Sequence, residues 1–169
     1  MKLIYYILIP ITLFLCFGNK GFAQEKVKLS LGMGVPELLN IGVRIPIKQT
    51  QIGFSFGIWP EYGCFLSFSG DFYMHFGGTS KFSDRHPWYS RGGFSYLHSE
   101  TSTLIKKSVY FNFRIGREIS FSKKIGMELD IGPGFLLFHD QIEKKAKEIY
   151  TTYPYQIFPF FGISVFYRL

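Results

Sequence analysis

FFGISVFYRL, at residues 160–169, alternates large apolar side chains with residues that are mostly small or polar. The first set is Phe161, Ile163, Val165, Tyr167 and Leu169, and the second is Gly162, Ser164, Phe166 and Arg168. Successive side chains of a β-strand point to opposite faces, so a period of two residues indicates a strand. The stretch therefore predicts a strand with one strongly apolar face.

Seven earlier segments show the same alternation. They are residues 27–35, 39–47, 52–59, 64–76, 88–97, 108–119 and 125–138, and the last strand is expected over 155–169. Most reach the roughly 9 to 11 residues that a tilted strand needs to cross the hydrocarbon core of a bilayer. After residue 24 no apolar run approaches the roughly 20 residues of a spanning helix. The sequence therefore predicts eight strands and no spanning helix in the mature chain.

The two faces of these strands favour a membrane barrel over a soluble β-sandwich. The polar face of a sandwich is free to carry many lysines and glutamates, whereas here that face is rich in glycine and serine, which suits the crowded inside of a narrow closed sheet. The apolar face carries one charge, Arg117, near a strand end where a long side chain can reach the interface. We expect an all-β fold, an eight-stranded antiparallel up-and-down transmembrane β-barrel, over residues 24–169.

The first residues, MKLIYYILIPITLFLCFGNKGFAQ, have a lysine at position 2, an apolar run from Leu3 to Phe17, and Ala23 before Gln24. This pattern is typical of a cleavable secretory signal peptide. The short apolar run, interrupted by Pro10, argues against a permanent membrane helix. The signal peptide is therefore assigned to residues 1–23. Its removal takes away two lysines and no acid, and so lowers the formal net charge from +7 to +5.

The terminal strand resembles the C-terminal strand of outer-membrane proteins, in which a glycine is followed by apolar and aromatic residues at alternating positions. Gly162, Val165 and Tyr167 match that spacing. In the family the barrel-assembly machinery recognises this strand, which usually ends on an aromatic residue, whereas this sequence ends Arg168-Leu169. The mature chain resembles small eight-stranded outer-membrane barrels such as the OmpA transmembrane domain or OmpX. The resemblance implies a monomer in the outer membrane of a Gram-negative cell, in contact with outer-membrane lipid and lipopolysaccharide.

Charged residues are expected on the inward face of the barrel. The cations there are Lys28, Arg44, Arg91, Arg114 and Arg168, and the anions are Asp71, Glu118, Glu128 and Asp130. Buried charges are costly unless they are paired, so this near balance predicts a salt-bridged network that fills the lumen. Its further polar members would be Tyr73, His75, Tyr110 and Asn112. An ion-conducting pore is not expected, because eight strands leave an interior that side chains can fill.

The connections are expected to alternate between the two ends of the barrel. Outer loops are placed at residues 36–38, 60–63, 98–107 and 139–154, and inner turns at 48–51, 77–87 and 122–124. The last two outer loops are the longest, as is common on the external side of outer-membrane barrels. Pro133 removes a ladder hydrogen bond inside a strand, so a local break is expected there.

Three classes of function stay open. The first is a structural or surface-interaction role through the last two outer loops, the second is modification of lipid A acyl chains, and the third is lipid binding by a soluble periplasmic β-protein. Two sets of residues are candidates for catalysis: His98 with Ser99 and Glu100, and His75 with Ser69 and Asp71. In neither set does the spacing along the chain place a histidine base between a serine nucleophile and a carboxylate that would orient the histidine. We expect no catalytic residue, cofactor, metal site or nucleic-acid partner, the positive charge being spread along the chain.

Overall fold

The computed structural model describes residues 27–59, 64–102, 104–143 and 157–169. The predicted signal peptide, the outer loop at 60–63 and most of the loop at 139–154 lie outside these ranges. The elements are β1 (Lys28–Val35), β2 (Leu38–Ile47), β3 (Thr50–Trp59), β4 (Cys64–Gly77), β5 (Trp88–Glu100), β6 (Leu104–Ser120), β7 (Ile125–Glu143) and β8 (Ile157–Arg168). Within the described ranges, no helix has the length and apolar character to cross a membrane.

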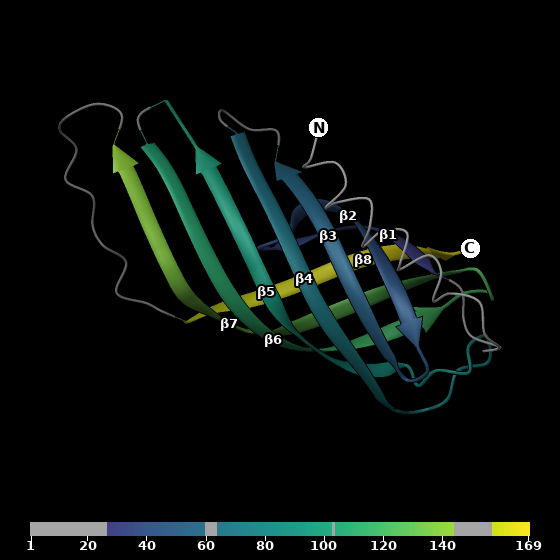
Figure 1. Cartoon of the computed structure of the whole chain (residues 1–169). Helices are drawn as coiled ribbons and strands as arrows, with labels where there is room; N and C mark the ends of the chain where they lie inside the picture. Colours follow the sequence, from purple (N-terminus) through teal and green to yellow (C-terminus); the bar gives the residue numbers. More distant parts are fainter. Residues whose placement is uncertain (1–26, 60–63, 103, 144–156) are drawn as a thin grey trace, which may run out of the picture.

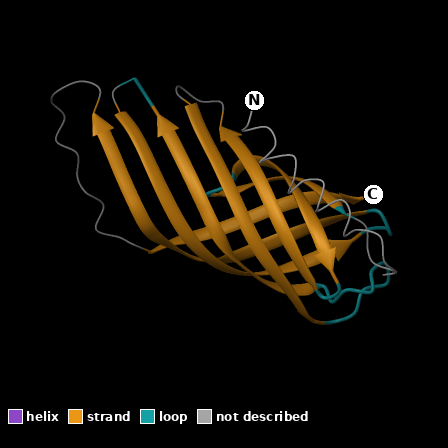
Figure 2. Cartoon of the chain, in the orientation of Figure 1, coloured by secondary structure: helices purple, strands orange, loops and turns teal. Residues whose placement is uncertain are grey.

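The eight strands form one closed antiparallel barrel in sequence order (Figures 1 and 2). Each strand pairs with the next along the chain, and β8 returns to pair with β1 from Lys28↔Arg168 to Val35↔Phe161. This closure removes the open sheet edge that an unpaired first or last strand would present. The predicted fold of eight antiparallel strands is confirmed. We call the end with the β2–β3, β4–β5 and β6–β7 connections the inner end, and the opposite end the outer end.

Side chains alternate between an apolar outside and a polar inside. The exposed fraction reaches 59% for Leu31, 66% for Ile131 and 53% for Val165, whereas Asn112 and Arg114 are fully buried. β-Branched and aromatic residues favour strands because they pack well on a pleated surface. In a water-soluble protein they would line the core, and lysine and arginine would rarely be buried. The barrel therefore has the reverse polarity of a soluble protein.

Strand boundaries differ from expectation mainly at the outer end. Residues 98–107 were assigned to a loop, but β5 continues to Glu100 and β6 begins at Leu104. Residues 139–143, also assigned to a loop, extend β7. These segments lack apolar alternation, yet they pair with each other, as in Lys107↔Asp140. Backbone pairing between neighbouring strands thus extends the sheet beyond its apolar pattern, so that β7 has 19 residues and β1 only 8.

Pro133 does not break β7, which runs without interruption from Ile125 to Glu143. It lies opposite Pro159 of β8, and pairing on that side is continuous. On the other side, the β6–β7 register skips Phe113 and Arg114. The predicted strand break is therefore wrong: a proline lacks one N–H and interrupts the ladder to one neighbour, while the other neighbour keeps the strand in place.

Closure between β1 and β8 can be tested by cross-linking in a chain whose native cysteines are replaced by serine. Leu31→Cys and Val165→Cys place two cysteines in directly opposite positions, where paired Cα atoms are about 4.5–5.5 Å apart and a disulfide can form. Ile41→Cys with Val165→Cys is the control, because β1 separates these positions by two strand spacings, about 10 Å. Oxidation should shift the gel mobility of the first pair alone, and a folded L31C/V165C protein that does not cross-link would contradict the closure.

Candidate functional site

The interior holds two groups of charged side chains. The outer cluster comprises Glu37, Asp71, Arg91, Arg114 and Asp130, and the inner cluster comprises Lys28, Arg44, Glu118, Glu128 and Arg168. Each of these residues is 8% exposed or less. Every strand cation and anion expected on the inward face lies in one of the two clusters, and Glu37 joins them from the β1–β2 turn.

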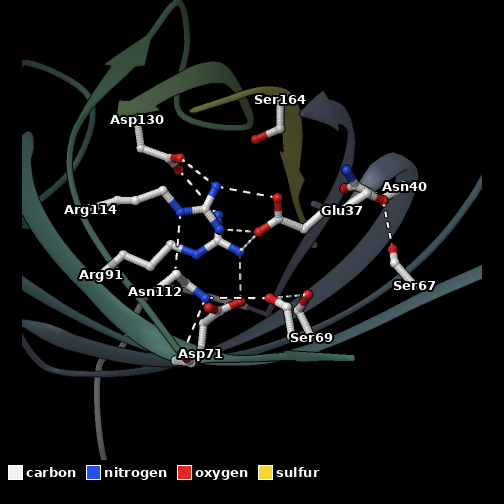
Figure 3. A network of polar contacts seen from close by, with 12 residues as sticks. Glu37, Asn40, Ser67, Ser69, Asp71, Arg91, Asn112, Arg114, Asp130 and Ser164 are labelled. Carbon is white, nitrogen blue, oxygen red and sulfur yellow. Dashed lines mark hydrogen bonds and ion pairs between the residues drawn. The ribbon is translucent and has the colours of Figure 1, made fainter. Parts of the chain in front are cut away.

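The Glu37 carboxylate faces two neighbouring guanidinium groups, those of Arg91 and Arg114 (Figure 3). Arg91 Nη2 donates to Glu37 Oε1 at 2.6 Å, and Arg114 Nη1 donates to Oε2 at 3.2 Å. Arg114 Nη2 also donates to Oε1, so the Arg114 fork binds both carboxylate oxygens. Such bidentate pairs fix geometry and are among the stronger hydrogen bonds in proteins. Glu37 thus holds β5 and β6 to the β1–β2 turn.

Two further carboxylates complete the outer cluster. Asp71 accepts a hydrogen bond from Arg91 at 2.6 Å, and Asp130 accepts from Arg91 at 3.2 Å and from Arg114 at 3.0 Å. Arg114 Nε donates to the amide oxygen of Asn112 at 3.2 Å. Two adjacent buried cations are tolerable here because three carboxylates surround them.

Glu37 was expected in an outer loop at residues 36–38 and not among the lumen residues. The turn instead folds into the lumen, where the Glu37 carbonyl accepts a hydrogen bond from Ser67 at 2.8 Å. Leu38, with φ of 62°, directs the chain inward at this point. Gly57 faces the same carbonyl, and a side chain at this position would collide with it. One signal was available: the inward strand cations outnumber the anions by five to four, and Glu37 supplies the missing negative charge.

The guanidinium groups also keep Glu37 ionised. Burial alone would raise the pKa of its carboxyl group, but the charges of Arg91 and Arg114 outweigh burial and hold that pKa below its ordinary value. A charged Glu37 is the form that both arginines require as a partner.

The inner cluster is a second ion-pair network nearer the other end of the lumen. Lys28 is paired with Glu118, and its Nζ atom lies 3.5 Å from Glu128 Oε1. Arg168 pairs with Glu118, and Arg44 pairs with Glu128. The two carboxylates thus bind three cations that come from β1, β2 and β8. The network ties the first and last strands to β6 and β7.

The connection between β4 and β5, residues 78–87, closes the inner end. Arg85 is 4% exposed, and its Nε atom donates to the Lys48 carbonyl at 3.2 Å. His75 Nδ1 lies within hydrogen-bond distance of the His86 carbonyl, which can only accept. The proton is therefore on Nδ1, and His75 Nε2 accepts from the Gln51 amide at 2.7 Å.

Tyr73 and Tyr110, both expected in the polar network, lie in different surroundings. The Tyr73 ring is 2% exposed and packs 5.6 Å from the Tyr89 ring, whose hydroxyl donates to Asp130 at 3.2 Å. Tyr110 is half-buried and packs 5.4 Å from the Phe160 ring, further toward the outer end. The inward polar layer ends near Asn112 on β6, so Tyr110 belongs to an aromatic layer above it.

The two sets of candidate catalytic residues are not assembled into a catalytic site. Ser69 donates to Ser95 at 2.9 Å, whereas His75 bonds to Gln51 at the inner end. His98 lies 3.6 Å from Glu100 on the same strand. Among the described residues, no group of three or more His, Cys, Asp or Glu side chains could hold a metal ion.

A serine–histidine pair that sequence analysis did not consider lies at the outer end. Ser108 Oγ is 2.9 Å from His139 Nδ1. The two residues are 31 positions apart and meet because the β6–β7 register places them opposite each other. Register across a β-bulge at Val109 and Tyr110 decides this contact. Sequence spacing carries no signal for it.

The lumen between the two clusters has little free volume. A cavity of about 30 Å³ lies among Arg44, Tyr73 and the residues of the outer cluster. That is room for one or two water molecules, at about 10–15 Å³ each by the same measure. The part of the lumen that holds the two clusters is therefore a packed polar core.

The three residues of the predicted assembly signal lie on β8. Val165 and Tyr167 face outward with exposed fractions of 53% and 41%. Gly162 faces the lumen, where a Cβ atom would lie 2.9 Å from the Asp130 carboxylate. The absence of a side chain at Gly162 leaves space for the outer cluster.

Glu37→Gln should lower the free energy of unfolding by about 3–5 kcal/mol, because it removes a charged partner from two buried arginines. Glu100→Gln is the control, since its side chain is 41% exposed beside His98 and exposed ion pairs contribute about 1 kcal/mol or less. Urea unfolding of the folded barrel measures both. Equal losses for the two variants would contradict the central role of Glu37.

The chain matches no known protein-family model, no curated protein and no solved structure.

Proposed function

We propose that this chain is an integral outer-membrane β-barrel protein with a plugged polar lumen and a structural or surface-interaction role at its outer end. The observation that carries the proposal is the reversed polarity of the barrel. Large apolar side chains are exposed on all eight strands, with fractions of 61% at Ile41 and 60% at Phe54. A water-soluble monomer rarely exposes a contiguous apolar surface of this kind. A bilayer provides the apolar surroundings that such a surface requires.

The height of the apolar band supports the same proposal. On β6 the outward positions run from Val109 to Ile119, with Arg117 as the one charge. These ten steps cover about 33 Å along the strand at roughly 3.3 Å per residue. A strand tilted by about 45° would span about 23 Å along the barrel axis over this length, near the roughly 25 Å of outer-membrane barrels. The Arg117 guanidinium lies 5.3 Å from the Trp88 ring near the inner end, an arrangement suited to an interface.

The interior argues against transport as the main role. Ion pairs cross the lumen in two clusters, and the cavity between them has a volume of about 30 Å³. A continuous water path would require both clusters to separate. We therefore propose a closed barrel that acts through its outer end, where β5, β6 and β7 extend past the apolar band.

The outer membrane is proposed over other membranes on the basis of the sequence. Residues 1–23 have the pattern of a secretory signal peptide. The terminal strand resembles the recognition strand of outer-membrane barrels at Gly162, Val165 and Tyr167. An export signal followed by a closed barrel is the arrangement of proteins that pass through the periplasm to the outer membrane.

Introducing one charge on the outward face can distinguish a membrane barrel from a soluble periplasmic protein. Ile115→Arg places a charge within the apolar band and should lower stability by about 2–4 kcal/mol in a bilayer. Ile105→Arg is the matched control on the same strand, beyond Lys107. A lipid-embedded barrel should fractionate with outer membranes, run faster on gels when unheated, and tolerate I105R better than I115R. Recovery in the soluble periplasm, with equal tolerance of both variants, would overturn the proposal.

Acyl transfer or hydrolysis is the second candidate function, and the Ser108–His139 pair is the observation that favours it. A serine hydroxyl within hydrogen-bond distance of an imidazole is the nucleophile–base pair on which many acyl-transfer enzymes depend. The first proposal predicts that lipid A mass spectra are identical in cells with and without this protein. An acyl-chain difference that disappears in Ser108→Ala, but not in Ser69→Ala, would replace the first function by the second.

A further inference from the structure

A cavity of about 350 Å³ opens at the outer end of the barrel, and we call it the vestibule. Its walls include Phe65, Leu97, Tyr110 and Phe158. Tyr110 is the next inward-facing residue after Asn112 on β6, in the direction of the outer end, and Leu97 is the next after Ser95 on β5. The vestibule therefore begins where the packed polar core ends. It differs from the space inside that core in both size and chemistry.

The lower part of the vestibule is aromatic. The Tyr110 ring meets the Phe158 and Phe160 rings edge-on, at centroid distances of 6.0 and 5.4 Å. Phe160 is 2% exposed and closes the aromatic layer from below. Edge-to-face ring packing holds these side chains in place, so the apolar surface is preformed. Half-buried apolar walls in an otherwise charged lumen suit the apolar part of a ligand.

The upper part of the vestibule is polar and basic. Lys106, Ser108 and His139 line it, and no carboxylate is found among the described residues that do so. The His139 Nδ1 and Ser108 Oγ atoms lie 2.9 Å apart on facing strands. These residues belong to the parts of β6 and β7 that extend past the apolar band. The extension thus adds a cationic rim to an aromatic cavity.

We propose that the vestibule binds a small amphiphile with an apolar body and one anionic head group, a carboxylate or a phosphate. The body would lie against Tyr110 and Phe158, and the head group would meet Lys106. A volume of 350 Å³ is at the lower end of the range of small-molecule sites, which are mostly apolar with a few polar groups. The inference rests on the proposed membrane barrel for its setting, since it places the open end outside the cell.

Binding can be measured by calorimetry on the full chain in phospholipid nanodiscs, with the signal from empty nanodiscs subtracted. The probes are octanoate, octyl phosphate, octanol and octyltrimethylammonium. Both anions should bind more tightly than octanol, and the cation should bind least. A preference for one anion identifies its head group as carboxylate or phosphate. Equal binding of octanol and the anions would overturn the proposed anion recognition.

Three variants locate the site. Lys106→Gln should weaken binding of the preferred anion about fivefold, the size expected of a partly exposed ion pair, and leave octanol unchanged. Lys107→Gln is the matched control, because it is the next residue and faces outward. Leu97→Trp should fill the vestibule and abolish binding of all four probes. Unchanged binding to L97W, or equal effects of K106Q and K107Q, would show that the probes bind elsewhere.

The two proposals fail in distinguishable ways. A chain that cannot be incorporated into nanodiscs as a heat-modifiable barrel contradicts the proposed membrane location. A chain that is incorporated, runs as a folded barrel and binds none of the probes above the empty-nanodisc signal contradicts the vestibule site alone.

Discussion

Apolar side chains cover the outside of this barrel, and this constraint leaves two kinds of position for the charged residues of the strands. One is an outward position near a strand end, where Arg117 lies beside the Trp88 ring. The other is the lumen, where an unpaired ion would cost several kcal/mol. The interior therefore has to pair the charges that the strands direct into it. Five cations and five anions, arranged in two clusters, satisfy that requirement.

Glu37 connects this electrostatic requirement to the shape of the molecule. Its turn enters the lumen from the outer end, so that the residue that neutralises Arg91 and Arg114 also fills the space above them. The inward turn depends on the absence of a side chain at Gly57. Above the turn, the charges give way to an aromatic layer and then to a basic rim. The lumen is thus a closed core with a small open chamber at one end.

The strands and their faces could be predicted from sequence because a barrel wall with one apolar and one polar face needs a regular two-residue period. The connections were less predictable. Residues such as His98 and Lys107 have no apolar alternation, and pairing with a neighbouring strand makes them part of the sheet. Pro133 lacks a backbone N–H donor, and only the strand register shows which neighbouring strand loses the ladder hydrogen bond.

The interior cation–anion balance could be anticipated, but the partners could not. Glu37 has the sequence context of an ordinary turn residue. The surplus of one cation among the inward strand residues was the one sequence feature that indicated a further anion in the lumen. The contact between Ser108 and His139 depends on a bulge in the β6–β7 ladder, which no local pattern encodes. The closure of the inner end by Arg85 likewise depends on how a ten-residue connection folds back, at residues 78–87.

The central claim, that lipid covers the outward face, can be tested directly with spin labels on single cysteines in a cysteine-free chain in vesicles. Labels at Ile41 and Ile131 test the outward face, and a label at Thr101 serves as the reference in the outer connection. Oxygen, which concentrates in the bilayer, should relax the first two labels more than a water-soluble nickel chelate does, and the order should reverse at Thr101. A nickel chelate that reaches Ile41 and Ile131 as readily as Thr101 would contradict the account.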